Sequence, residues 1–243
     1  MPVAVLSDIH SNIEALDAVL RDAEAQGAES FLSLGDIVGY GADPSAVIAR
    51  LRGLRTVSVA GNHDLVACGK MGVEDFNPVA ARAALWQETQ LNSDEIAYLA
   101  LLPVVHIESA ATLVHGSLRA PEWEYLLDEE AALAQFALQT TPVSMVGHSH
   151  LQFAARLVAD GDVRFQDAKH DETLELGAEP LILNPGSVGQ PRDGDPRAGY
   201  LLYDEAAATV TWRRVEYDVP SAQKKIIDAG LDRFLAERLA VGK

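Results

Sequence analysis

The chain has 243 residues, of which 48% are hydrophobic, so it can bury a large core and is not a disordered polypeptide. Lysine and arginine number 19 against 36 aspartate and glutamate residues, which gives a formal net charge of −17. Such an acidic chain is a poor general binder of nucleic acids or anionic membranes, because both reward basic surfaces. The single cysteine, Cys68, excludes an intramolecular disulfide bond and a cysteine-based zinc cage.

The first third of the chain alternates predicted strands and helices. Residues 3–6, 31–34 and 56–60 are short apolar runs typical of buried strands, and residues 13–26 and 44–52 have the spacing of helices. Helical crossovers between strands favour a parallel sheet covered by helices. The amino terminus lacks the basic and apolar segments of a signal peptide, so we expect a cytoplasmic protein.

The rest of the chain is predicted to be helical at first and then rich in strands. Helices are expected over residues 78–89, 94–101 and 129–138, a hairpin over 104–108 and 112–115, and strands over 143–146, 152–158, 163–166, 181–183, 199–204 and 209–217. Asp160-Gly161 predicts a hairpin turn. One terminal helix is expected over residues 220–240, with its apolar stripe formed by Ile226, Ile227, Leu231, Phe234 and Leu235. Without a repeat or linker, residues 1–243 are predicted to form one domain, with a core over about 1–190 and an extension over 191–243.

Polar side chains follow five of the predicted strands, at the point where each strand ends. These strand ends carry Asp8 and His10, then Asp36, then Asn62, His63 and Asp64, then His115, and finally His148 and His150. Loops at the carboxyl ends of neighbouring strands converge on one crevice, so we expect these side chains to meet. Asp8 and His10, like His148 and His150, are separated by one residue, so an extended backbone would point both side chains of each pair to the same side.

Seven of these residues are metal donors, which is enough for two ions that share one carboxylate: Asp8, His10, Asp36, Asn62, His115, His148 and His150. Oxygen and imidazole donors without thiolate favour manganese, iron, cobalt, nickel or zinc over calcium. We expect two divalent ions, with manganese as the first choice. Any single block could be an ordinary turn or helix start, and only their recurrence at successive strand ends favours a metal site.

The same blocks resemble the signature motifs of the calcineurin-like metallophosphoesterases. The matching blocks are Asp8-x-His10, Gly35-Asp36, Gly61-Asn62-His63-Asp64, His115 and Gly147-His148-Ser149-His150, in the family's order, with Ser149 where many members have threonine. Residues 35–40 resemble most the small prokaryotic phosphodiesterases related to diadenosine tetraphosphatases, and residues 184–192 resemble the segment that follows the core in small prokaryotic members. The resemblance implies an α/β fold in four layers, a two-sheet β-sandwich flanked by helices.

The resemblance also implies a role for each matching residue. Asp8, His10, Asp36 and His150 would hold one ion, and Asp36, Asn62, His115 and His148 the other, so that Asp36 bridges them. His63 would be the catalytic histidine and Asp64 its orienting partner. Two ions about 3.5–4 Å apart grip phosphoryl oxygens and generate a bound hydroxide near neutral pH. An imidazolium at His63 would then protonate the leaving oxygen.

The expected function is hydrolysis of small phosphodiesters or nucleotides. Two divalent ions outweigh the carboxylates of Asp8 and Asp36, so the site would attract anions inside an acidic protein. The alternatives are a dinucleoside-polyphosphate hydrolase, a phosphomonoesterase such as a protein phosphatase, or a non-catalytic scaffold. The expected partner is a small phosphate ester, with no membrane and no general nucleic-acid binding, and the apolar terminal helix makes a homodimer conceivable.

Substrate contacts are expected from Asn62, Arg192, Arg197 and Asn12. The two arginines flank Asp193-Gly194-Asp195 and could clamp a phosphate, or lie in a solvated turn. Asn12 could face the phosphate, although its position favours a helix cap. Tyr40 could stack on a nucleobase or pack on its own loop. The loops expected to shape the pocket are residues 40–44, 68–77, 118–127 and 190–197.

Overall fold

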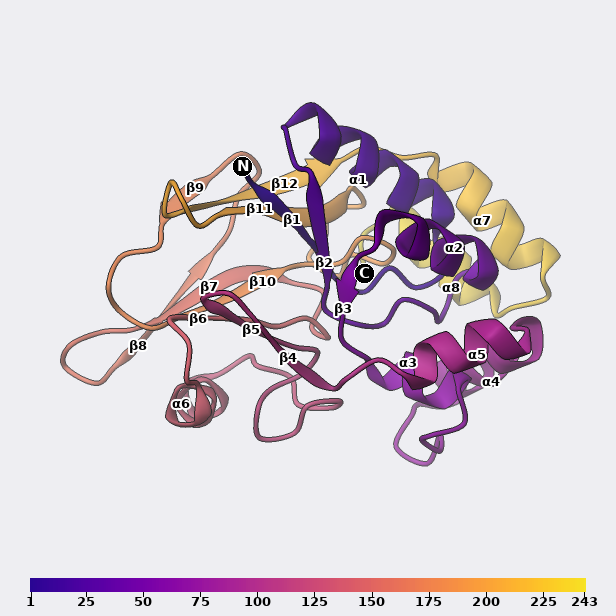
Figure 1. Ribbon diagram of the computed structural model, residues 1–243. Helices are drawn as coiled ribbons and strands as arrows, with labels where there is room; N and C mark the ends of the chain where they lie inside the picture. Colours follow the sequence, from indigo (N-terminus) through magenta and orange to yellow (C-terminus); the bar gives the residue numbers. More distant parts are fainter.

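The computed structural model describes residues 1–243, and its strands form two mixed sheets of six strands each (Figure 1). The first sheet has the order β3-β2-β1-β11-β12-β9 and the second the order β4-β5-β6-β10-β7-β8. The strands are β1 (Val3–Leu6), β2 (Ser30–Ser33), β3 (Val57–Ser58), β4 (Val105–Glu108), β5 (Ala111–Val114), β6 (Val143–Met145), β7 (Gln152–Leu157), β8 (Val163–Asp167), β9 (Thr173–Glu175), β10 (Leu181–Pro185), β11 (Ala198–Asp204) and β12 (Thr209–Val215).

Helices cover the outer faces of both sheets. They are α1 (Ile13–Ala25), α2 (Pro44–Leu54), α3 (Asn62–Ala67), α4 (Pro78–Gln90), α5 (Ser93–Ala100), α6 (Glu129–Leu138), α7 (Val219–Asp228), α8 (Arg233–Glu237) and the 3₁₀ helix η1 (Arg238–Ala240). In Figure 1, α1, α2 and α7 lie on the side of the first sheet, α6 lies below the second sheet, and α3, α4 and α5 form a group at one end. The expected layers, with two sheets between helices, are confirmed.

The core lies in separate apolar layers that follow from the alternation of side chains along each strand. In β1, Val5 points between the two sheets, whereas Ala4 and Leu6 point toward the helices. Trp212 of β12 is buried between the sheets, and its indole N–H donates to the carbonyl oxygen of Asn184 at 2.9 Å. Burial of each large apolar side chain stabilises the fold by about 1.5–3 kcal/mol.

Most predicted elements are confirmed, some with identical bounds. The first and last residues of β1 and α6 agree with the prediction. The strands β1, β2 and β3 pair in parallel, β4 and β5 form the expected hairpin, and β7 and β8 pair around the turn at Gly161. Gly161 has a φ of 91°, a conformation that glycine adopts without a steric penalty.

The prediction of one terminal helix over residues 220–240 is wrong, because the chain ends α7 and restarts. Gly230 has a φ of 73°, which terminates the first helix, and the Asp232 side chain accepts from the backbone N–H of Phe234 to begin α8. The predicted stripe is split as a result. Ile226 and Leu235 are buried, whereas Ile227 is 50% exposed and Phe234 is 54% exposed.

Two further elements differ from the prediction. Residues 62–67 form α3 immediately after Gly61, where a loop was expected. Residues 173–175 form β9, a short edge strand on β12 whose polar sequence has no apolar alternation to indicate it. None of the helices combines the length and the apolar composition that crossing a membrane would require.

Candidate metal centre

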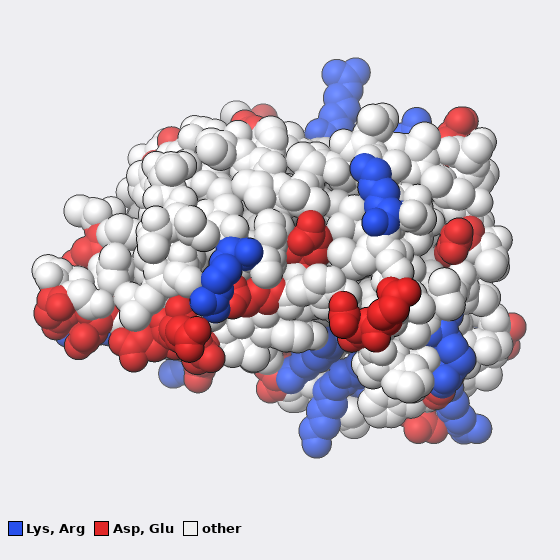
Figure 2. All heavy atoms as spheres, turned by 90° about the horizontal axis from the view of Figure 1, so that it is seen from below, with Lys and Arg blue, Asp and Glu red and all other residues white.

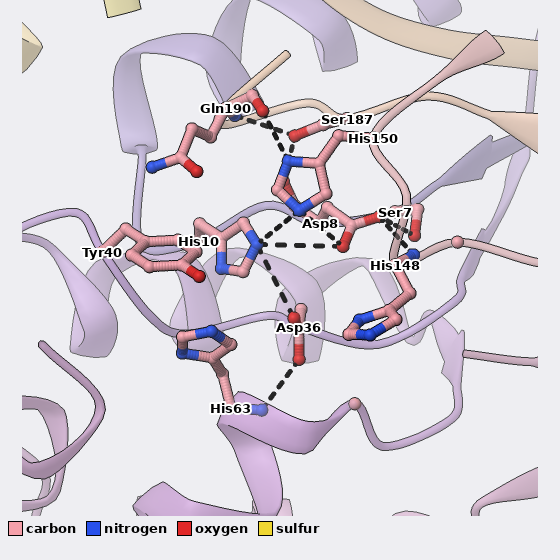
Figure 3. Close-up of polar contacts among 12 residues, drawn as sticks. Ser7, Asp8, His10, Asp36, Tyr40, His63, His148, His150, Ser187 and Gln190 are labelled. Atoms are coloured by element: carbon pink, nitrogen blue, oxygen red, sulfur yellow. Dashed lines mark hydrogen bonds and ion pairs between the residues drawn. The ribbon is translucent and has the colours of Figure 1, made fainter. Parts of the chain in front are cut away.

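The polar residues at the five strand ends meet in one buried site, as expected (Figure 3). The loops after β1, β2, β5 and β6 and the first turn of α3 bring together Asp8, His10, Asp36, Asn62, His63, His115, His148 and His150. Each of these side chains is buried. Burying carboxylates and imidazoles away from water costs free energy unless cations or hydrogen bonds replace the lost hydration.

The pairs separated by one residue do not use the extended backbone expected from the sequence. Asp8, His10, His148 and His150 have φ values of 53°, 47°, 63° and 61°, and Asp36 has a φ of 50°. These are left-handed conformations, which are uncommon for residues other than glycine and cost about 1–2 kcal/mol. Strained backbone of this kind persists where the surrounding structure holds it, and it is frequent at functional sites.

The first cluster contains Asp8, His10 and His150. Nε2 of His150 lies 3.2 Å from Oδ1 of Asp8 and 3.2 Å from Nε2 of His10. Nε2 of His10 is 3.8 Å from the same carboxylate oxygen. The other oxygen of Asp8 accepts from the Ser7 hydroxyl at 2.6 Å and from the backbone N–H of His148 at 3.1 Å. Oδ1 is therefore left facing the two imidazoles.

The second cluster contains Asp36, His115 and His148. Nε2 of His115 lies 3.3 Å from Oδ2 of Asp36 and 3.1 Å from Nδ1 of His148. Oδ2 of Asp36 is also 3.6 Å from Nε2 of His10, so this one oxygen faces both clusters. The resemblance implies that Asp36 is the shared ligand, and its carboxylate lies between the two clusters.

Backbone carbonyl groups determine which imidazole nitrogen faces the site. Nδ1 of His10, His115 and His150 lies within hydrogen-bonding distance of the carbonyl oxygens of Val38, Leu34 and Gln190, respectively. A carbonyl can only accept, so each Nδ1 carries a proton, and in the neutral form of each ring Nε2 presents a lone pair to the site. This arrangement is typical of metal-binding histidines, whose outer nitrogen is held by a hydrogen bond.

Unpaired polar atoms inside the site are a second observation that fits bound cations. Oδ1 of Asp8, Oδ1 of Asn62, Nδ1 of His63 and Nε2 of His148 are buried and have no hydrogen-bond partner. Buried polar atoms are nearly always paired, and a site for a bound ion is one physical reason for an exception. Oxygen and nitrogen donors at these distances are chemically suited to divalent transition metals.

Burial and mutual interaction shift the pKa values of the clustered groups. Burial opposes ionisation of Asp36, but His115 and His63 outweigh it and lower the pKa of the carboxyl below its usual value. Burial alone would lower the pKa of His115, but Asp36 raises it to about 9. Burial lowers the pKa of His148 to about 3. The aspartates are thus ready to bind cations, whereas His115 must release a proton to act as a ligand.

His63 lies at the wall of the site, and its ring packs against Tyr40. The two ring centroids are 4.4 Å apart, and the ring of His10 is 4.6 Å from that of Tyr40. Tyr40 therefore packs on these imidazoles. Burial lowers the pKa of His63 to about 4, which favours the neutral ring over the imidazolium expected from the sequence.

The expectation that Asp64 orients His63 is not met. Oδ1 of Asp64 accepts from the backbone N–H of Val38 at 3.0 Å, and Oδ2 accepts from that of Gly61 at 3.0 Å. Neither oxygen bonds the His63 ring. Because the side chain of the third helical residue turns back to the helix start, Asp64 caps α3 and ties it to the loop after β2. Burial and the neighbouring Asp36 raise the pKa of Asp64 to about 7.

Gly61 allows the close approach between α3 and Asp36. A Cβ atom at this position would lie 2.1 Å from Oδ1 of Asp36 and 2.5 Å from its backbone nitrogen. That oxygen also accepts from the backbone N–H of His63 at 2.9 Å. Any larger residue at position 61 would displace the carboxylate that both clusters share.

The other residues predicted to contact the substrate, Arg192, Arg197 and Asn12, lie in different places in the structure. Arg192 lines the cavity beside the two clusters. Arg197 lies at a different pocket, where it forms an ion pair with Asp195. The oxygen of the Asn12 side chain caps α1 by accepting from the N–H of Ala15, and its nitrogen donates to the carbonyl of Gly189, so both polar atoms have partners within the chain.

The cavity beside the clusters has a volume of about 180 Å³ and an aromatic wall that the sequence did not indicate. Phe76 packs edge-on against His63 with centroids 5.0 Å apart, and against Trp123 at 4.8 Å. Tyr125 stacks on His148 at 4.0 Å and is 47% exposed. These three residues come from two of the loops expected to shape the pocket. The sequence indicated the loops but not which of their residues line the cavity.

Comparison with known proteins extends the resemblance over the whole chain. A family model described as the calcineurin-like phosphoesterase superfamily domain matches residues 1–207. A crystal structure of a metallophosphoesterase from Sphaerobacter thermophilus is 40% identical, with a TM-score of 0.91, and the match covers 100% of this chain and 99% of that one. An uncharacterized protein of Methanocaldococcus jannaschii is 37% identical over 99% of this chain and 98% of its own length. The phosphodiesterase YfcE of Escherichia coli is 25% identical over 86% of this chain and 91% of its own length.

Proposed function

Since the chain belongs to the calcineurin-like phosphoesterase superfamily, we propose that it is a two-metal phosphodiesterase that hydrolyses small phosphodiesters or nucleotides. The family makes the protein a metal-dependent phosphoric ester hydrolase. Beyond this, we propose the number of ions, the substrate class and the roles of individual residues.

One observation carries this proposal, the position of the Asp36 carboxylate. Its Oδ2 atom faces His10 of the first cluster and His115 of the second, at 3.6 Å and 3.3 Å. Asp8 and His150 would complete the first metal site, and Asn62 and His148 the second. When bound, two such ions act as Lewis acids toward the phosphoryl group.

The protein's own residues would then orient the substrate and handle its proton. Asn62 lines the cavity and its NH₂ group can donate to a phosphate oxygen, and the Arg192 guanidinium lies at the same cavity wall, where it can bind another. His63 is the proposed proton donor to the leaving oxygen. A phosphate anion beside its ring favours the charged imidazole and so opposes the effect of burial.

The aromatic wall supports a substrate with a planar group. Phe76, Trp123 and Tyr125 line the cavity, and exposed aromatic rings stack on nucleobases with about 1–3 kcal/mol per base. The charge pattern supports a small substrate over a nucleic acid. On the face shown in Figure 2, acidic side chains gather in clusters, and basic side chains stand singly or in small groups between them.

The experiment that tests the proposal is metal removal followed by reconstitution. The metal-free protein is assayed with bis-p-nitrophenyl phosphate, p-nitrophenyl phosphate and a cyclic nucleotide, after addition of manganese, iron, cobalt, nickel or zinc. We expect no turnover without metal, and diester hydrolysis that saturates at two ions per chain. Saturation at one ion, or metal binding with no hydrolysis of any ester, would contradict the proposal; the second result would favour a scaffold.

A further inference from the structure

A second cavity adjoins the metal centre, and two arginines line it. This cavity has a volume of about 280 Å³ and shares five lining residues with the cavity at the clusters: Tyr40, Asn77, Ala80, Tyr125 and Arg192. Its far side is formed by α8 and η1, which contribute Phe234 and Arg238. No carboxylate is among its lining residues.

The two arginines differ from all others in the chain in how they are paired. Eight arginines form ion pairs with carboxylates: Arg50, Arg82, Arg119, Arg156, Arg197, Arg213, Arg214 and Arg233. Four others have no such partner and are exposed to solvent: Arg21, Arg52, Arg55 and Arg164. Only Arg192 and Arg238 are partly buried without an aspartate or glutamate partner, in a chain that has 36 of these acidic residues.

The guanidinium groups of both residues are held in place but keep donors free. Arg192 lies over the Tyr40 ring at 5.7 Å, and its Nη2 donates to Oε1 of Gln190 at 3.0 Å. Arg238 lies over the Phe234 ring at 5.2 Å, and its Nε donates to an oxygen of the C-terminal carboxyl group, that of Lys243. Nε of Arg192 is buried without a partner, and neither terminal nitrogen of Arg238 donates to an acceptor of the chain.

We propose that Arg192 and Arg238 form a second anion site, which binds another phosphate group of the substrate while the phosphate to be cleaved lies at the metal centre. Guanidinium forks match phosphate oxygens in geometry and charge, and two of them facing one cavity would bind an anion more strongly than either alone. The position of Arg192 at both cavities places this site directly beside the first.

The electrostatics of Arg238 agree with an anion between the two groups. Burial and the nearby Arg192 lower the pKa of Arg238 to about 10, because two like charges lie close together. A phosphate bound between the two guanidinium groups would offset this repulsion. Arg238 also lies outside residues 1–207, the part of the chain that the family model matches.

The second site narrows the substrate class. It rests on the proposed function and selects, among phosphate esters, those with at least two phosphate groups, such as a dinucleoside polyphosphate or an ester of a nucleoside diphosphate. The aromatic wall would then take a base of the same molecule. A simple diester would occupy the metal centre but leave the arginines without an anion.

The activity test compares two substrates in the fully metallated enzyme. In the Arg238→Gln variant, kcat/KM for diadenosine tetraphosphate should fall about tenfold more than kcat/KM for bis-p-nitrophenyl phosphate, the loss typical of one charge-assisted contact. The control is Arg164→Gln, which removes an exposed and unpaired arginine of β8 and should leave this ratio as it is in the wild type. An equal loss on both substrates, or no loss, would overturn the proposal.

A binding test separates the second site from the proposed function. Calorimetry of the metal-free protein with tripolyphosphate should show binding that weakens about tenfold in Arg238→Gln and is unaltered in Arg164→Gln. Equal affinity in all three proteins, or no binding to the wild type, would refute the second site. Absence of diester hydrolysis with every metal would instead refute the proposed function, while selective loss of tripolyphosphate binding would still support the arginine pair.

Discussion

The backbone N–H of His63 donates a 2.9 Å hydrogen bond to Oδ1 of Asp36. This bond, made by the first turn of α3, holds the carboxylate so that its second oxygen faces the two histidine clusters. The helix that carries the proposed proton donor therefore also positions the proposed shared ligand. A change at Asp36 should affect both proposed metal sites at once.

The Asp36→Asn variant tests this relationship. An amide has one acceptor, so its NH₂ group must face either the His63 N–H or the cations, and each arrangement is unfavourable. We expect the metal content to fall and kcat/KM for bis-p-nitrophenyl phosphate to drop on the order of 10³-fold. Elemental analysis and steady-state kinetics measure the two effects. The control is Asp94→Asn, at an exposed carboxylate of α5; two bound ions and normal turnover in Asp36→Asn would contradict the shared-ligand role.

Replacement of His63 should change the dependence on the leaving group. If the imidazole protonates the leaving oxygen, His63→Asn should lower kcat by about 10²-fold or more for alkyl esters, whose leaving groups are poor. The loss should be far smaller for p-nitrophenyl esters, because p-nitrophenolate leaves without a proton. Kinetics with a series of phosphodiesters of graded leaving-group pKa measure this slope. An equal loss across the series would exclude His63 as the proton donor.

Asp64 should matter for stability more than for catalysis. Asp64→Ala leaves the backbone N–H groups of Val38 and Gly61 buried without acceptors, which costs about 2 kcal/mol or more. Asp64→Asn keeps one acceptor oxygen, so its loss of stability should be smaller. Urea denaturation of the two variants measures the difference. Unchanged stability combined with a selective loss of kcat would restore the role that the sequence suggests for this residue.

The residues that follow the C-terminal ends of α1 and α2 are a matched pair of positions for measuring the cost of a left-handed backbone. Gly27 follows α1 with a φ of 85°, whereas Arg55 follows α2 with a φ of 53° and is exposed. Arg55→Gly should therefore stabilise the protein by about 1 kcal/mol, and Gly27→Ala should destabilise it by about as much. Thermal denaturation reports both changes. A lower melting temperature for Arg55→Gly would contradict the assignment of strain to this position.

Asp22 of α1 links the first sheet to its covering helix in a pH-dependent way. Its carboxylate accepts from the Tyr200 hydroxyl at 2.6 Å and from Nη2 of Arg213 at 2.9 Å. Burial opposes ionisation, but Arg213 and Tyr200 outweigh it and lower the pKa of Asp22 below its ordinary value. Between the folded and unfolded pKa values the unfolded chain binds more protons, so this contribution to stability is lost as the pH falls.

Comparison with Asp22→Asn isolates this effect from the other carboxylates. The wild type should be more stable than the variant by about 1 kcal/mol at neutral pH, and the difference should shrink as the pH falls below about 4. Urea denaturation at several pH values measures it. A difference that does not depend on pH would show that the carboxylate charge makes no contribution.

The metal centre could be predicted because its residues stand beside strong local signals. Asp8, Asp36 and His148 follow apolar runs, and within each of the two sheets the ends of neighbouring parallel strands lie at the same edge. Their left-handed backbone could not be predicted, since it results from loops packing against one another. The role of Asp64 was misassigned for a similar reason: the adjacent sequence position suggested a contact with His63, but the carboxylate turns back to the start of its own helix.

The walls of the two cavities depend on distant parts of the chain and leave no periodic signal. The ring centroids of Trp123 and Phe76 lie 4.8 Å apart although 47 positions separate these residues in the sequence, and both residues lie in loops. Arg238 reaches its place only because Gly230 breaks the terminal helix and turns η1 toward the site. An unbroken helix, as the apolar stripe suggested, would carry this arginine elsewhere.

The left-handed residues of the metal centre affect how an inactive enzyme for substrate trapping should be made. Alanine at His10 or His150 would keep the unfavourable φ while removing the side-chain contacts that stabilise it. Loss of activity in such a variant could therefore result from misfolding as well as from loss of the ligand. Asn62 lies in the helical backbone of α3 and contributes one amide oxygen that no other group uses. A crystallographer who wishes to capture an uncleaved nucleotide would do best to begin with the Asn62→Ala enzyme.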